Sequence, residues 1–127
     1  MEHVDDVDAV LQEVNIELNG MNPTLLSGYG GFYASRRPGF STSAVAWLEL
    51  GGAYAVANMR GGGEYGEDWH RGGMLGNKQN VFDDFACVAE HLIERGVTSA
   101  EKLGIYGRSN GGLLVTASLL QHPDLFG

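Results

Sequence analysis

The sequence predicts an α/β fold, in which parallel strands alternate with helices. Short apolar segments that read as strands are each followed, after a loop, by a segment with helical patterning. The strand segments are residues 24–27, 53–58 and 103–106, and the helical segments are residues 41–50, 80–95 and 111–121. Short connections between such units imply right-handed crossovers and a parallel sheet. Reactive groups of this sheet type lie at the carboxyl ends of the strands, here in the loops 28–32, 60–78 and 107–111.

The strand segments share short length and apolar character. Ala53–Asn58 is uniformly apolar, which predicts burial on both faces. Thr24–Ser27 leads directly into a glycine-rich loop, and Leu103–Tyr106 precedes a tight turn that contains glycine. These segments are therefore expected to form the centre of the sheet.

Each helical segment has its own start and stop signals. The first begins at hydroxyl residues from Ser41 and stops at Gly51. In the second, Asn80 is expected to cap the helix, Asp83 and Asp84 favour its positively polarised start, and Gly96 ends it. One face of this helix is apolar, formed by Val81, Phe85, Val88 and Leu92. Pro123 ends the third helix.

The first 22 residues are acidic and weakly patterned. Val14, Ile16 and Leu18 alternate like a strand, and Asn19-Gly20 is typical of a turn. The repeated strand and helix pattern starts at Pro23. We therefore divide the chain into an N-terminal segment, residues 1–22, and one α/β domain, residues 23–127.

The composition is that of a soluble globular domain, with 43% hydrophobic and 19% charged residues. The net charge of −8 and the absence of Lys or Arg before Arg36 argue against a nucleic-acid partner. No secretory signal or long apolar stretch is present, so no membrane association is expected. The single cysteine, Cys87, fits a reducing cytoplasm, and its mid-helix position without a basic neighbour argues against a nucleophilic role.

The sequence Gly107-Arg108-Ser109-Asn110-Gly111 matches the G-x-S-x-G nucleophile elbow. In this motif the serine occupies a strained turn between a strand and a helix, and the two glycines leave room where strand and helix almost touch. Both required flanks are present, because a predicted strand precedes the motif and a predicted helix follows it. The alternative is a glycine-rich loop whose serine has no catalytic role. Such a loop does not require a strand before it and a helix after it.

A serine nucleophile also requires hydrogen-bond donors for the oxyanion that forms during acyl transfer. The backbone N–H of Asn110, the residue after the serine, is the first expected donor. The second is expected from the loop Gly28-Tyr29-Gly30-Gly31-Phe32, where the Tyr29 hydroxyl can donate. Packing of Tyr29 under the loop is the equally weighted alternative.

A competing motif, G-x-G-x-x-G, occurs at residues 61–66. A dinucleotide site would need these glycines to open directly into a helix, whereas Gly72, Gly73 and Gly76 are expected to delay any helix. Arg60, Glu64 and Trp69-His70 are therefore interpreted as parts of a structured loop. No metal or cofactor is expected.

Several motifs in order make the chain resemble the prolyl oligopeptidases, serine peptidases that join an α/β-hydrolase domain to a β-propeller. The match runs from about Asn22 to Gly127. Besides the elbow and the Gly28–Phe32 loop, it rests on these stretches: Pro23-Thr24-Leu25-Leu26, Ala57-Asn58-Met59-Arg60-Gly61-Gly62-Gly63-Glu64-Tyr65-Gly66, Trp69-His70, Asn77-Lys78-Gln79-Asn80, Phe82-Asp83-Asp84-Phe85 and Pro123-Asp124-Leu125-Phe126. Asn110 and the Gly-Tyr-Gly-Gly-Phe loop resemble the proline-specific branch more than the oligopeptidase B branch.

The resemblance implies a cytosolic endopeptidase that cuts short peptides after proline. Ser109 would attack, Tyr29 and Asn110 would hold the oxyanion, and Phe32 would line the pocket for the proline ring. It also implies that the propeller, the triad acid and the triad histidine lie outside these 127 residues, so that residues 23–127 are an incomplete catalytic domain. The four histidines, His3, His70, His91 and His122, do not occupy the expected place.

Two alternatives remain open. The chain is an inactive remnant if the missing segments are never supplied. A non-peptidase esterase with the same fold would more often carry a His-Gly-Gly-Gly type of loop where this chain has Gly28–Phe32.

Overall fold

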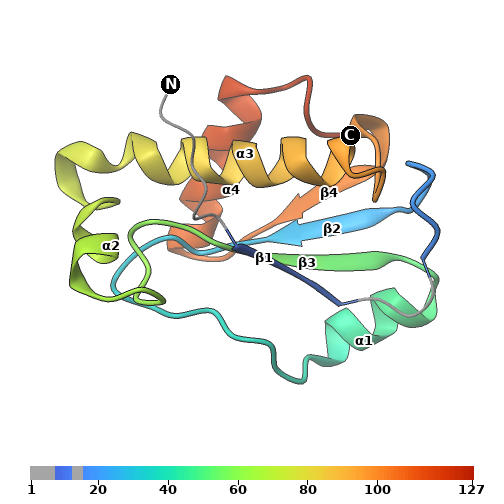
Figure 1. Cartoon of the computed structure of the whole chain (residues 1–127), viewed down its shortest axis with the longest axis horizontal. Coiled ribbons are helices and arrows are strands. Elements are labelled where there is room, and N and C mark those ends of the chain that lie inside the picture. Colours follow the sequence, from blue (N-terminus) through green and yellow to red (C-terminus); the bar gives the residue numbers. More distant parts are fainter. Residues whose placement is uncertain (1–7, 13–15) are drawn as a thin grey trace.

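The computed structural model describes residues 8–12 and 16–127, which form a four-stranded sheet with helices on both sides (Figure 1). The strand order is β1-β3-β2-β4, formed by β1 Asp8–Gln12, β2 Thr24–Ser27, β3 Ala53–Asn58 and β4 Leu103–Tyr106. β2 pairs in parallel with both β3 and β4. The predicted α/β fold class is confirmed, and β2, β3 and β4 have the predicted bounds.

Strand β1 differs from the expected N-terminal strand. It pairs antiparallel with β3, with Asp8 opposite Asn58, so the sheet is mixed rather than wholly parallel. Ile16 and Leu18 lie in irregular chain, which makes the expected strand wrong for these two residues, and Val14 lies outside the described residues. The free edge of β3 offers unpaired backbone groups, and these pair with an extended segment whatever its side-chain pattern.

The helices cover the two faces of the sheet unequally (Figure 1). α3, Gln79–Glu94, and α4, Asn110–Gln121, pack on one face, and α1, Thr42–Glu49, lies against β3 on the other. Burial along β3 alternates as a result: its three alanines are fully buried towards α3 and α4, whereas Tyr54, Val56 and Asn58 are half-buried. The prediction that β3 is buried on both faces is therefore wrong, because α1 alone covers the second face within the described chain.

Helix α3 supplies six of the fourteen buried core residues, four of them from the predicted apolar stripe. Val81, Phe85, Val88 and Leu92 are all buried against Leu26 and neighbouring strand residues. The Ser41 hydroxyl accepts a hydrogen bond from the Ala44 N–H and caps α1, as expected. None of the described helices is long and apolar enough to span a bilayer.

The start of α3 departs from expectation. The helix begins at Gln79 after Lys78, so Asn80 lies inside it rather than capping it. The Asn80 side chain instead donates to the Gly72 carbonyl, 2.8 Å away, and ties the helix to the preceding loop. Asp84 lies too far into the helix to act on its first turn, and it is used elsewhere.

Candidate active site

Ser109 occupies the tight turn between β4 and α4. Its φ of 55° and ψ of −120° are strained for a residue with a side chain, as the elbow motif predicts. The residue is exposed and directly precedes the first helical residue, Asn110. The turn therefore presents the hydroxyl group at the carboxyl end of the sheet and at the amino end of a helix.

The two motif glycines are required by close backbone contacts. A Cβ atom at Gly107 would overlap the Gly111 carbonyl, and a Cβ atom at Gly111 would lie 2.7 Å from the Gly28 carbonyl oxygen. The strand, the turn and the helix thus approach each other through bare backbone. This geometry confirms the steric reading of the motif.

The Asn110 backbone N–H is available to a ligand. In the described chain no backbone or side-chain group accepts a hydrogen bond from it, as is usual for the first N–H groups of a helix. Helix N-termini favour negative charge. A negatively charged oxygen bound near Ser109 would meet this donor.

The loop after β2 meets the serine turn, as expected, through a contact that the sequence did not predict. The Asn110 side-chain amide donates to the Tyr29 carbonyl at 2.6 Å. Gly31 makes this contact possible, because a Cβ atom there would lie 2.6 Å from Asn110 Nδ2. The backbone of Tyr29 is therefore anchored beside Asn110, while its half-buried side chain carries the hydroxyl group.

Phe32 lies at the end of the same loop and faces solvent. Its side chain is 79% exposed, and both Phe32 and Tyr33 have positive φ, at 54° and 58°. Two consecutive left-handed residues with bulky side chains are uncommon and strained. The loop after β2 therefore places the Phe32 ring in solvent, and no group in the described residues encloses it.

Lys78 was not among the expected site residues. Its ammonium group donates to the Gly30 carbonyl at 2.9 Å and to Asn110 Oδ1 at 3.3 Å. Burial lowers the pKa of Lys78 below its ordinary value. The resemblance includes this lysine in Asn77-Lys78-Gln79-Asn80, but sequence spacing alone gives no sign that it reaches two other loops.

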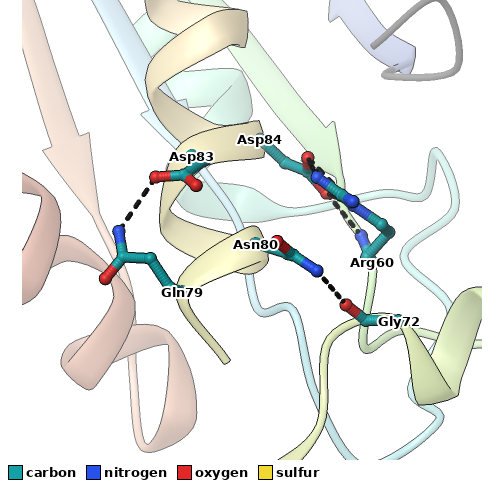
Figure 2. A network of polar contacts seen from close by, with 6 residues as sticks. All are labelled: Arg60, Gly72, Gln79, Asn80, Asp83 and Asp84. Carbon is teal, nitrogen blue, oxygen red and sulfur yellow. Dashed lines mark hydrogen bonds and ion pairs between the residues drawn. The ribbon is translucent and has the colours of Figure 1, made fainter. Parts of the chain in front are cut away.

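Arg60 and Asp84 form a partly buried ion pair that holds the loop after β3 against α3 (Figure 2). The Arg60 Nε and its own backbone N–H donate to Asp84 Oδ2, at 2.9 Å and 3.0 Å, and a terminal nitrogen donates to Oδ1. The Asp84 side chain is fully buried. Asp83, its neighbour, is exposed and accepts only a bond from Gln79 at 2.9 Å. The bond to Asp84 raises the pKa of Arg60.

The segment expected as one long loop contains two short helices, α2 Glu67–Arg71 and the 3₁₀ turn Leu75–Asn77. A helix therefore does follow the G-x-G-x-x-G motif directly, contrary to expectation. Its first turn carries Glu67 and Asp68, whose charges oppose a pyrophosphate, and it has five residues only. This short acidic helix therefore does not support a dinucleotide site.

The interpretation of this segment as a structured loop is confirmed. His70 Nδ1 lies 2.8 Å from the Gly61 carbonyl and the ring packs edge-on against Tyr33. Glu64 accepts a bond from the Arg36 N–H at 3.0 Å. His70 is thus engaged in the loop. His91 lies on the far part of α3 and His122 follows α4, whereas His3 lies outside the described residues.

Comparison with known proteins identifies the arrangement. The profile of the prolyl oligopeptidase family matches residues 38–127. The chain is 51% identical over 110 residues to the prolyl endopeptidase of Elizabethkingia meningoseptica, covering 87% of this chain and 16% of that protein. It therefore spans about a sixth of the length of such relatives.

Solved structures agree with the sequence comparison. A post-proline cleaving enzyme from Rickettsia typhi superimposes with a TM-score of 0.91 at 44% identity, over 95% of this chain and 18% of that one. Oligopeptidase B from Trypanosoma brucei, with covalently bound antipain, gives 0.89 at 43% identity, over 94% and 17%. With the fold, the strained serine and the family profile in agreement, the chain belongs to the prolyl oligopeptidase family of serine peptidases.

Proposed function

We propose that this chain carries the nucleophile and the oxyanion-binding groups of a peptidase that cleaves short peptides after proline. Ser109 Oγ would attack the scissile carbonyl and form an acyl-enzyme. The observation that carries the proposal is the strained φ of 55° at Ser109, directly before the free N–H of Asn110. A strained, exposed serine at a helix N-terminus matches the elbow of acyl-transfer enzymes.

Two groups are proposed to stabilise the oxyanion. The Asn110 N–H is the first, and the Tyr29 hydroxyl is the second. The bond from Asn110 Nδ2 to the Tyr29 carbonyl supports this pairing, because it keeps the two residues adjacent. The general base and its acid are proposed to come from sequence outside these 127 residues, as the resemblance implies.

Specificity for proline is the finer part of the proposal. The exposed ring of Phe32 is proposed as one wall of the pocket for the proline ring. The name of the relative from Elizabethkingia meningoseptica favours proline. Oligopeptidase B resembles the chain almost as closely, so overall similarity does not discriminate and the pocket residue must be tested.

The test uses protein expressed from the complete reading frame, with a chromogenic Gly-Pro substrate and a matched Gly-Arg substrate. We expect hydrolysis of the first alone, and loss of about 10⁶ in turnover for Ser109→Ala. Phe32→Ala should weaken the discrimination between the substrates. Equal activity of Ser109→Ala and the parent protein would refute the nucleophile, and preference for arginine would refute the specificity.

The same assay separates a peptidase from an inactive remnant. A serine without its base stays protonated, so the 127-residue chain alone should be inactive beside the complete protein. If the protein from the complete reading frame is also inactive towards both substrates, the alternative of an inactive remnant is correct. If the 127-residue chain is as active as the complete protein, a base within it, with His70 the first to test, replaces the proposed external one.

A further inference from the structure

We propose that Lys78 is a positioning residue, which holds the oxyanion-binding loop in place against the nucleophile turn. This inference rests on the proposed function of Ser109, Tyr29 and Asn110. It follows from one ammonium group that bonds to two loops at once, at 2.9 Å to the Gly30 carbonyl and 3.3 Å to Asn110 Oδ1.

The contacts define the orientation of the Asn110 amide. An ammonium group can only donate and a carbonyl can only accept, so Oδ1 must face Lys78 and Nδ2 must face the Tyr29 carbonyl. Without the lysine, Oδ1 would lose its donor and the amide could rotate away from Tyr29. Lys78 is therefore connected to Tyr29 by two routes. One is its bond to Gly30, the next residue in the chain, and the other is its bond to Asn110, which binds the Tyr29 carbonyl.

Lys78 connects three segments that are distant in sequence. It directly precedes α3, whereas Gly30 follows β2 and Asn110 begins α4. The contacts span 48 and 32 residues. Because glycine-rich loops are conformationally permissive, the loop after β2 needs such an external tie to stay in one conformation.

The loop has little free space, so small movements matter. Gly30 has φ of 64°, and a Cβ atom there would overlap the side chain of Val81 on α3. A Cβ atom at Gly31 would lie 2.6 Å from Asn110 Nδ2. The loop thus packs closely against α3 and Asn110, and the bonds from Lys78 hold it there.

The charge of Lys78 is also unusual for a structural lysine. The side chain is half-buried, and no carboxylate among the described residues pairs with it. Its hydrogen-bond partners are neutral oxygens only. A cation that bonds to the side chain of Asn110 adds positive potential near the proposed oxyanion donor of that residue.

The test compares Lys78→Met with Lys78→Arg, and with Lys102→Met as the matched control, in protein from the complete reading frame. Lys102 is the only other lysine of the chain and belongs to the turn Ala100–Lys102, before β4 rather than after it. Each variant is measured for kcat and KM, and for inhibition by a peptide aldehyde and by a non-covalent peptide analogue. The aldehyde forms a tetrahedral adduct that needs the oxyanion donors, whereas the analogue does not.

We expect Lys78→Met to lower kcat about 10- to 100-fold, because misplacing a donor by a small distance has effects of that size. Aldehyde affinity should fall by a similar factor, while KM and analogue affinity change less than about threefold. Lys78→Arg should retain part of the activity, and Lys102→Met all of it.

Three results would overturn the inference while leaving the proposed function intact. The first is an active parent protein with unchanged kcat in Lys78→Met. The second is a rise in KM alone, which would place Lys78 in substrate binding. If Lys78→Met does not fold, Lys78→Arg decides: a loss of analogue affinity as large as the loss of aldehyde affinity there would be the third, because it would show no specific effect on the oxyanion donors. Equal activity of Ser109→Ala and the parent would instead defeat the proposed function.

Discussion

The turn after β4 and the loop after β3 both contain closely spaced glycines at the carboxyl end of the sheet, yet they are held in different ways. In the turn, Gly107 and Gly111 let strand and helix meet through backbone alone. The loop, residues 60–78, has such a backbone contact at Gly73, but side chains also tie it to α3: Arg60 binds Asp84, and Asn80 binds Gly72 (Figure 2).

The difference indicates what each segment is sensitive to. A turn shaped by missing side chains is disrupted by one added methyl group. A loop held by charges and amides is disrupted by removing a partner. Both segments are therefore expected to be sensitive to volume added at their crowded glycines, and the loop is expected to depend in addition on its charge pair.

The largest effect on stability is expected for Arg60→Met. It removes the guanidinium from the fully buried Asp84 and leaves only the bond from the backbone N–H of residue 60, so the loss should approach the value of about 3–5 kcal/mol for breaking a buried pair. Urea unfolding, followed by the fluorescence of Trp47 and Trp69, measures the change. The double variant Arg60→Met with Asp84→Leu should recover most of the loss, since apolar replacement of a whole pair is often neutral. If the double variant does not recover stability, the loss of the Arg60–Asp84 pair is not the cause of the destabilisation.

Gly107→Ala is expected to have the next effect, and mainly on activity. The new methyl group would overlap the Gly111 carbonyl, which should destabilise by about 1–3 kcal/mol and misplace Ser109. A displacement of about 1 Å lowers turnover roughly 100-fold. Gly76→Ala, in the loop after β3, is the matched control, because a Cβ atom there meets open space. Equal losses in both variants would show that the close contact at Gly107 is not the cause.

Asn80→Ala should produce a smaller loss, about 1 kcal/mol, because it removes one partly buried hydrogen bond to Gly72. Asn77→Ala removes a similar amide bond to Arg71 that is exposed, and should have less effect. Thermal unfolding of the two variants beside the parent chain measures the difference. A larger effect for Asn77→Ala would show that burial does not determine how the loop is held.

The smallest effect is expected for Arg71→Gln. The Arg71–Glu67 pair is exposed on both sides, so solvent screening limits its contribution to about 0.3–0.5 kcal/mol, and salt should abolish it. In the Arg60–Asp84 pair the carboxylate is fully buried, so this pair should keep more of its effect in the same salt. Unfolding at low and high ionic strength distinguishes the two, and equal salt sensitivity would contradict the assignment of Asp84 as buried.

The sequence by itself determined the elements whose signals are local. Strands β2, β3 and β4, the Ser41 cap and the serine turn were all predicted, because apolar runs, capping hydroxyls and the glycines of G-x-S-x-G act on neighbours within a few residues. The conformation of Ser109 belongs to this group, since its strain follows from the motif.

Only the tertiary structure decided the contacts between distant segments. Asp84 was expected to favour a helix start and instead binds Arg60, 24 residues away, and Asn80 binds the loop rather than capping α3. Lys78 reaches Gly30, and Asn110 reaches Tyr29 across 81 residues. Polar side chains carry no periodic signal for such pairings. Their partners are chosen by which loops the sheet order brings to the same edge, and that order depends on the packing of the whole chain.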